Sequence, residues 1–214
     1  QGVDDLPSVP LLTYNRRAGA RNLTLWPLPG YHAPGAAGFA HARSPDPVPW
    51  ATKADRAVWR GDLSGQERLA DGRPGHSAHR ILSGLDHIAP EDEAGLAAIR
   101  ARLGTVPRMA AVQALRGPDF DMALVLSRFM AEFAPVLHGY LDQHRPQPWF
   151  YGFRYILSLP GYDTGSNFIM AANSGSVVMK AEDGWELFYT PLFRPWEHYI
   201  PLAADASDAV EKLD

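Results

Sequence analysis

Residues 154–202 read RYILSLPGYDTGSNFIMAANSGSVVMKAEDGWELFYTPLFRPWEHYIPL, and the fold class is predicted from the pattern of this region. Short apolar runs that are rich in strand-forming residues occur at 155–159, 177–179 and 199–202. Between the first two runs lies SNFIMAANS, which is long enough for the crossover helix that two parallel strands need. The pattern predicts an α/β fold with a parallel, Rossmann-like sheet, of the kind that makes up a nucleotide-binding half-fold.

The central part of the chain extends this α/β pattern. RAVWRG predicts a short strand ending in Gly61, and LSGQERLADG predicts a short helix that Ser64 caps and Gly72 closes. A second helix is predicted at 91–103, where acids come first and arginines last, as the helix dipole favours. The spacing of apolar residues over 119–141 predicts a longer helix that packs on the sheet.

Composition excludes several classes of protein. The 214 residues carry a net charge of −4, which provides no general field for holding a nucleic acid. No apolar run reaches the roughly 18 to 20 residues of a membrane span. The absence of Cys excludes disulfides, thiolate metal sites and cysteine nucleophiles. High Ala, Arg, Gly and Pro usage is typical of a GC-rich bacterial source, so we expect a cytoplasmic, bacterial protein.

Two loops that follow predicted strands are candidate anion sites, because ligands of open α/β sheets lie beyond the carboxyl ends of the strands. In PGYDTGS, Gly165 allows a tight turn, and Ser166 and Asn167 fall at a helix start that attracts a diphosphate. The alternative is that Ser166 is only an N-cap. In WRGDLSG, Arg60 offers a planar fork for phosphate oxygens, and Gly61 lets a ligand approach the backbone.

For Arg60 the alternative is an ion pair with Asp62 or Glu67.

Metal ligands are sparse: His76 and His79 lack a third ligand at the spacing of zinc enzymes. Asp119 and Asp121 form a D-x-D sequence, a pattern that can clamp a divalent metal. Pro118 opens a predicted helix at this point, which makes both acids candidate caps. No metal site is predicted, and a requirement for a divalent metal stays open.

Five blocks together resemble glycosyltransferase family 90, which contains protein O-glucosyltransferases, capsule xylosyltransferases and bacterial lipopolysaccharide-modifying enzymes. The blocks are RAVWRGDLSG, RYILSLPGYDTGSNF, NSGSVVMK, GWELFY and RPWEHYIPL. The resemblance implies a GT-B architecture of two Rossmann-like halves, with a UDP-sugar held mainly by the C-terminal half. It also implies transfer with inversion at the anomeric carbon and no tightly bound cofactor.

The resemblance carries over to individual positions. Arg60, Gly61 and Ser64 match the family's RG-S/T block, and its glycine-to-helix turn matches Gly165, Ser166 and Asn167. Glu186 and His198 match positions at the nucleotide end of the cleft, where a carboxylate would hold ribose hydroxyls. His198 is also interpreted, alternatively, as a buried core imidazole. The family's catalytic base is an Asp in a D-aromatic-P segment, for which Asp5 in DLP is the best match and Asp4 the next.

The resemblance also divides the chain. Residues 1–50, dense in Pro and Gly, are predicted to form loops and short edge strands, a remnant of the N-terminal acceptor-side half and an interdomain segment. Residues 51–214 are predicted to form the UDP-sugar-binding domain, truncated at its C-terminal end. We interpret the chain as a fragment dominated by the nucleotide-binding half.

The leading hypothesis is an inverting glycosyltransferase. It would move glucose, xylose or a similar sugar from UDP to a hydroxyl of a surface glycan, lipopolysaccharide or protein. One alternative is a fragment that binds a nucleotide sugar without turnover, and another is a purely structural α/β domain. The oligomeric state stays open.

Overall fold

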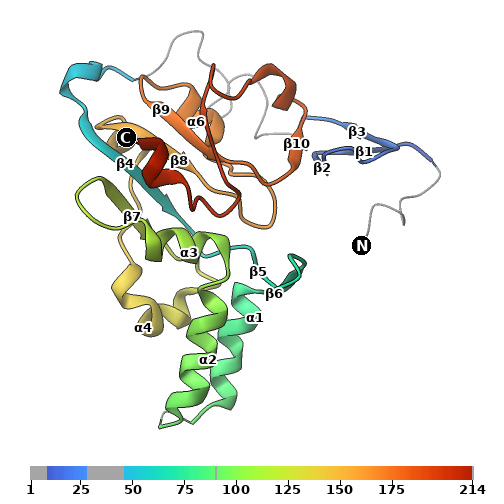
Figure 1. Ribbon diagram of the computed structural model, residues 1–214, viewed down its shortest axis with the longest axis vertical. Helices are drawn as coiled ribbons and strands as arrows, with labels where there is room; N and C mark the ends of the chain where they lie inside the picture. The colour runs from blue at the N-terminus through green and yellow to red at the C-terminus, as the bar shows by residue number, and fades with distance from the viewer. Residues whose placement is uncertain (1–8, 28–45, 90, 214) are drawn as a thin grey trace.

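A computed structural model describes residues 9–27, 46–89 and 91–213, and its centre is a five-stranded parallel sheet (Figure 1). The strands lie in the order β11, β9, β8, β4, β7, and every neighbouring pair is parallel. Their bounds are β4 Ala54–Gly61, β7 Phe120–Leu124, β8 Phe153–Ser158, β9 Val177–Ala181 and β11 Ile200–Leu202. The predicted α/β fold and the four strands expected near residues 57, 157, 178 and 200 are confirmed.

Both faces of the sheet are buried, as expected for parallel strands. Successive residues of each strand point to opposite faces, so Trp59 and Leu157 belong to one apolar cluster and Val58 and Ile156 to another. Helix α3 (Pro107–Ala114) packs on the first face, and α6 (Phe168–Ala172) on the second. Helix α6 is the crossover predicted between β8 and β9, although it is only five residues long.

The order of the strands creates a switch point. Along the chain β7 follows β4, but the next strand, β8, returns to the other side of β4. The chain therefore adds β7 on one side of β4, and β8, β9 and β11 on the other side, so the strand order reverses between β4 and β8. In open α/β sheets, ligands bind at such a switch point outside the carboxyl ends of the strands. The loops after Gly61 and after Ser158 are thus where a ligand is expected.

A helical pair projects from the sheet (Figure 1). It consists of α1 (Ala78–Leu82), the 3-10 helix η3 (Ser83–His87) and α2 (Glu93–Leu103). The predicted helix at 91–103 is confirmed within two residues at its start. Asp92 caps it, accepting a hydrogen bond from the backbone nitrogen of Gly95 at 2.9 Å.

The short helix predicted after Ser64 is wrong. The chain instead forms a hairpin of β5 (Gln66–Arg68) and β6 (Pro74–Ser77). Gly72 has a φ of +81°, and its backbone nitrogen bonds to the carbonyl of Leu69, so it serves the hairpin turn instead of ending a helix.

The long helix predicted over 119–141 is also wrong. Its first part is strand β7, in which Phe120 and Leu124 are buried. Three short helical segments follow later: η4 (Ala131–Phe133), α4 (Ala134–Leu137) and η5 (His138–Tyr140). The apolar spacing therefore runs over several short elements. Asp119 and Asp121 do not cap a helix, because the segment that they begin is extended.

The N-terminal part forms short strands, as predicted. Strands β1 (Leu11–Thr13) and β3 (Leu23–Leu25) pair in parallel, and β2 (Asn15–Arg17) pairs antiparallel with β10 (Trp185–Leu187). The remaining short helices are η2 (Trp50–Thr52), α5 (Gln147–Phe150), η6 (Thr190–Leu192) and α7 (Ala209–Leu213). None of the helices in the described ranges has the length and apolar character needed to cross a membrane.

Candidate functional site

The loops that follow β4 and β8 touch each other at the switch point. A Cβ added to Gly161 would overlap Ser64 Oγ, and one added to Gly65 would lie 3.1 Å from the carbonyl oxygen of Gly161. Gly65 also has a φ of +113°, a conformation that side chains disfavour. Glycines at these positions therefore let two backbones meet where the sheet changes direction.

Arg108, at the start of α3, fastens the two loops together. Its Nη1 donates to the carbonyl oxygen of Asp62 at 2.9 Å and to Ser64 Oγ at 2.7 Å. Its Nε and Nη2 donate to the carbonyls of Pro160 and Leu159, both at 3.0 Å. Burial lowers the pKa of Arg108 to about 10, against the opposing charges of Asp62 and Asp163. The guanidinium remains cationic at neutral pH and adds positive charge to the switch point.

A cleft of about 270 Å³ opens beside these loops. The hairpin β5–β6, the loop after β8, strand β2 and the segment around β10 form its walls. We call it the switch-point cleft; its lining includes Arg17, Gln66, Glu67, Arg68, Pro160, Gly161, Tyr162, Asp183 and Trp185. Two cations and two aromatic rings thus face one concavity at the carboxyl ends of the strands.

The two arginines of the switch-point cleft differ in how firmly they are held. Arg17 Nη1 donates to the carbonyl oxygen of Asp183 at 2.6 Å, and its guanidinium lies 4.1 Å from the ring centre of Trp185. Arg68 is exposed, and within the described residues its side chain makes no hydrogen bond or ion pair, although its charge acts on the carboxylate of Asp205. Arg68 is therefore free to bind an anion, whereas Arg17 is held in place on the Trp185 ring.

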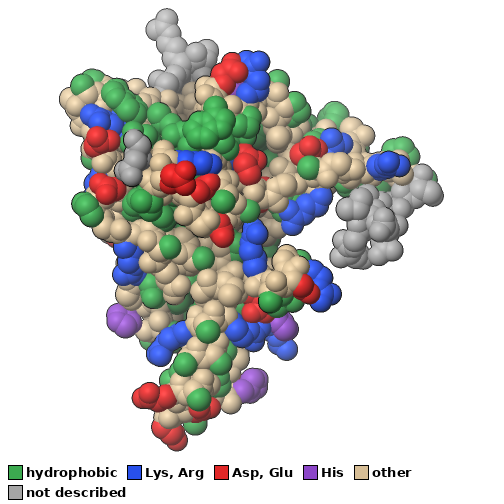
Figure 2. All heavy atoms as spheres, viewed as in Figure 1, with side chains coloured by type: hydrophobic (Ala, Val, Ile, Leu, Met, Phe, Trp, Pro, Cys, Tyr) green, Lys and Arg blue, Asp and Glu red, His purple; other side chains and the backbone are tan. Residues whose placement is uncertain are grey.

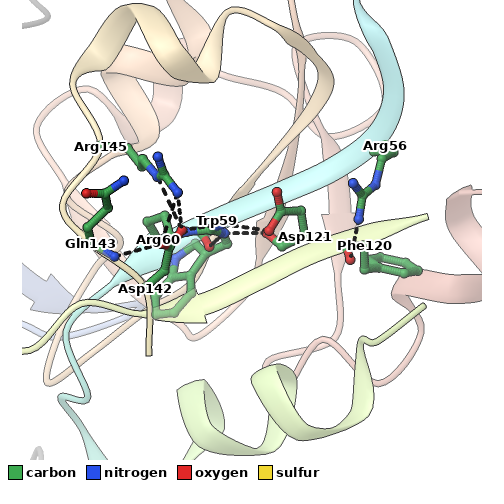
Figure 3. Close-up of polar contacts among 8 residues, drawn as sticks. All are labelled: Arg56, Trp59, Arg60, Phe120, Asp121, Asp142, Gln143 and Arg145. Carbon is green, nitrogen blue, oxygen red and sulfur yellow. Dashed lines mark hydrogen bonds and ion pairs between the residues drawn. The ribbon is translucent and has the colours of Figure 1, made fainter. Parts of the chain in front are cut away.

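The predicted anion ligand Arg60 lies in a carboxylate cluster (Figure 3). Its Nη2 is 2.6 Å from Asp121 Oδ1, its Nε is 2.8 Å from Asp142 Oδ2, and its side chain is 7% exposed. Arg145 forms a second ion pair with Asp142. The alternative pairing with Asp62 or Glu67 is wrong, because the partners come from β7 and the loop before α5.

The rest of the predicted RG-S block also has structural contacts. A Cβ on Gly61 would lie 2.5 Å from the buried indole of Trp59, so this glycine makes room for a core side chain. Ser64 does not cap a helix, since strand β5 follows it. Its hydroxyl instead accepts the hydrogen bond from Arg108.

The glycine-to-helix turn before α6 does not line the switch-point cleft: Gly165 lines a separate small pocket, which shares Trp185 with that cleft. Gly165 is buried, and a Cβ there would overlap Ser158 Oγ. Ser166 is exposed and is not the N-cap; that position belongs to Asn167, whose side-chain nitrogen donates to the carbonyl oxygen of Leu157 at 2.7 Å. The Asn167 amide thereby ties the helix start to β8, and the N-cap alternative for Ser166 is wrong.

Glu186 and His198, the two residues matched to the nucleotide end of the cleft, have different surroundings. Glu186 Oε2 accepts from Arg16 Nε at 2.8 Å, which joins β10 to β2. His198 is exposed, and its Nδ1 accepts from the backbone nitrogen of Arg194 at 2.9 Å, so the buried-core alternative is wrong. The candidate bases Asp4 and Asp5 lie outside the described residues.

No protein-family model matches the chain, but part of it is similar to known proteins. Protein O-glucosyltransferase 1 of Rattus norvegicus is 34% identical over 61 residues, which cover 28% of this chain and 16% of that protein. Protein O-glucosyltransferase 1 of Homo sapiens is 33% identical over 61 residues, with the same coverage. Uncharacterized protein 027R of Frog virus 3 is 28% identical over 68 residues, which are 7% of its length. The matched segment thus spans less than a fifth of these relatives, and over it the chain resembles a glucosyltransferase.

Sequence reasoning missed Arg17, Arg68, Tyr162, Trp185 and Arg108. Tyr162 and Trp185 lie inside blocks that carry the family resemblance, and their aromatic character beside glycines was the available signal. Arg108 follows Pro107 at a helix start and belongs to no motif. Its role depends on carbonyl oxygens that lie more than forty residues away in the chain.

Proposed function

We propose that this protein is a glycosyltransferase that uses a UDP-sugar, and that the switch-point cleft holds the UDP part of the donor. The observation that carries the proposal is the meeting of Arg17, Arg68, Tyr162 and Trp185 in one cleft at the switch point of a parallel sheet. The similarity to protein O-glucosyltransferases supports a sugar-transfer reaction over other uses of such a cleft.

Each group has a role that suits its chemistry. Arg68 presents an unoccupied guanidinium whose planar fork matches phosphate oxygens. Arg17 supplies a second cation, held against Trp185 at 4.1 Å. Tyr162 and Trp185 offer flat apolar surfaces on which the base or the sugar can stack. The turn at Gly165, Ser166 and Asn167 lies at the neighbouring pocket that shares Trp185 with the cleft, and the Ser166 hydroxyl there is exposed and can bond to a part of the donor that extends beyond the cleft.

The reaction needs a base on the acceptor and cations on the leaving group. In inverting transfer, a carboxylate takes the proton of the acceptor hydroxyl while its oxygen attacks the anomeric carbon and UDP departs. Positive groups stabilise the charge that develops on the diphosphate, a role for Arg68 and Arg17 with Arg108 behind them. Asp5, with Asp4 next, is the proposed base, and a glucose-type donor and a hydroxyl of a glycan or protein are the proposed substrates.

Calorimetric titration with UDP tests the site. Arg68→Gln removes the free cation from the cleft, and we expect UDP to bind about tenfold more weakly, since tenfold corresponds to about 1.4 kcal/mol. Arg73→Gln is the matched control, because Arg73 lies on the turn of the same hairpin and pairs with Asp71 at 2.7 Å outside the cleft. Equal UDP affinity in both variants would contradict the proposed site.

Turnover separates the enzyme from the alternatives. With UDP-glucose or UDP-xylose, the wild-type protein should release UDP, and Asp5→Asn should release it at least about a hundredfold more slowly, as loss of a general base does. UDP binding without turnover would favour a non-catalytic nucleotide-sugar-binding module. Absence of UDP binding would favour a structural α/β domain.

A further inference from the structure

A second concavity lies on the other side of the hairpin, between β6 and the helical pair. It has a volume of about 260 Å³, and we call it the basic pocket; it is lined by His76, Arg80, Ser83, Gly84, His87 and Arg102. In Figure 2, blue and purple side chains gather below the hairpin, in the part of the molecule that contains α1. Every ionisable group in the lining is an arginine or a histidine.

The spacing along the chain explains how these side chains come together. Arg80, Ser83 and His87 follow one another at intervals of three and four residues, and His76 precedes them on strand β6. Such intervals place side chains on one face of a helix. Helix α1 and η3 continue in this way from residue 78 to residue 87, and Ser77 caps the start by accepting from the backbone nitrogen of Arg80 at 3.1 Å.

Glu67 holds Arg102 in position on another side of the basic pocket. Arg102 Nε donates to Glu67 Oε2 at 2.9 Å and its Nη2 to Oε1 at 2.6 Å. These bonds from Arg102, joined by those from His76, hold the pKa of Glu67 at about 2 despite its burial. Glu67 is 5% exposed, so its carboxylate lies behind Arg102 and does not compete for a ligand in the pocket.

The remaining donors of the basic pocket have no acceptor in the described part of the chain. Arg102 Nη1 makes no hydrogen bond there, and neither the guanidinium of Arg80 nor the imidazole of His87 has a polar partner. Arg80 and His87 are both exposed. An acidic residue, Asp86, precedes His87 but is not part of the lining. The pocket therefore presents several N–H groups and an excess of positive charge to solvent.

We propose that the basic pocket binds the phosphate or carboxylate group of an anionic ligand other than the sugar donor. Arg80 and the outer edge of Arg102 form the cationic sides, and guanidinium groups bind such oxyanions by paired, charge-assisted hydrogen bonds. The imidazole of His87 supplies a further N–H donor. Glu67 also lines the switch-point cleft, so it separates the two sites.

Titration with inorganic phosphate, followed by amide NMR shifts, tests this site. Arg80→Gln should weaken phosphate binding about tenfold, so that the shifts around residues 80–87 need about ten times more phosphate to develop. Arg100→Gln is the matched control, because Arg100 is exposed on α2 but does not line the pocket. Arg68→Gln should leave this binding unchanged, which separates the basic pocket from the switch-point cleft.

A parallel titration with acetate distinguishes the two ligand chemistries. Acetate shifts that depend on Arg80 would identify a carboxylate ligand, and shifts with phosphate alone would identify a phosphorylated one. The proposal is overturned if neither anion shifts residues 80–87, or if Arg80→Gln binds both as the wild type does. UDP calorimetry on Arg80→Gln reports separately on the donor site and should match the wild type.

Discussion

Arg60 and Arg108 both lie near the carboxyl end of β4, but their surroundings differ. Arg60 bonds to two carboxylates, Asp121 and Asp142, and Arg145 lies on the second of these (Figure 3). Arg108 bonds to three backbone carbonyls and the hydroxyl of Ser64. The charge of Arg60 is therefore neutralised where it lies, whereas the hydrogen-bond acceptors of Arg108 are neutral groups.

The difference shows that an arginine after a strand is not by itself an anion site. A guanidinium whose fork is filled by carboxylates contributes to the fold and has little charge left for a ligand. One that rests on neutral acceptors stabilises loops and still adds positive charge to the crevice beside them. Arg108 thereby supports the switch-point cleft without lining it, and the Arg60 cluster supports the edge of the sheet.

Replacing Arg108 should have the largest effect. Arg108→Met removes four hydrogen bonds and leaves the carbonyls of Asp62, Leu159 and Pro160 without their donor. We expect a loss of about 3 kcal/mol in the free energy of unfolding. UDP affinity should fall as well, because the two loops separate. Urea denaturation measures the first effect and UDP titration the second; unchanged UDP affinity in a folded variant would show that Arg108 supports the cleft no more than Arg60 does.

Replacing Arg60 should affect stability alone. Arg60→Met leaves Asp121 without its arginine partner and leaves Asp142 with Arg145 alone. We expect the free energy of unfolding to fall by about 2 kcal/mol, since both carboxylates retain contact with solvent. UDP affinity should stay within about twofold of the wild type, because little of the charge was available. A tenfold loss of UDP affinity at unchanged stability would instead make Arg60 a donor ligand.

Gly61 offers a smaller test on the same strand. Gly61→Ala introduces a Cβ 2.5 Å from the indole of Trp59, a side chain that is 2% exposed. Overpacking of this kind should cost about 1.5 kcal/mol. Thermal unfolding measures the loss, and Gly139→Ala is the control, because a Cβ at Gly139 would meet no atom within 4 Å. Equal melting temperatures would show that Gly61 is not required by Trp59.

The ion pairs around Arg60 should also make the free energy of unfolding depend on pH. Burial acts to raise the pKa of Asp142, but hydrogen bonds from Gln143, Arg145 and Arg60 lower it from 3.8 to about 2. A carboxyl whose pKa is lower in the folded state contributes stability above pH 3.8, and the contribution disappears as pH falls to about 2. We expect about 1 kcal/mol to be lost over this range. Denaturation curves of wild type and Asp142→Asn measure it; identical pH slopes would contradict the ion pair.

The parts of the fold that were predictable are those with a local signal. The strands β8 and β9 contain the apolar runs 155–157 and 177–179 because both faces of the sheet are buried, and α2 has acids before it and arginines at its end. The prediction of one helix over 119–141 was wrong because apolar residues at helical spacing occur by chance across β7 and three short helical segments. The prediction that Gly72 ends a helix was wrong because a glycine that ends a helix and one in a hairpin turn cannot be told apart from the sequence.

The sequence predicted where in the fold the candidate site lies, but not which side chains meet there. The loops beyond β4 and β8 were identified because parallel strands end at one edge of a sheet. The partners of Arg60 were not, since Asp121 and Asp142 lie 61 and 82 residues away along the chain. Arg17 enters the cleft only because β2 pairs with β10. Contacts of this kind depend on tertiary structure, which no local pattern specifies.

The NMR response of two tryptophan indoles to UDP can locate the nucleotide directly. Trp185 lines the switch-point cleft, and Trp149 lies 4.9 Å from the guanidinium of Arg60. If the cleft is the donor site, UDP should shift the Trp185 indole N–H and leave that of Trp149 unchanged. A shift of Trp149 without a shift of Trp185 would place the nucleotide at the Arg60 cluster and contradict the account.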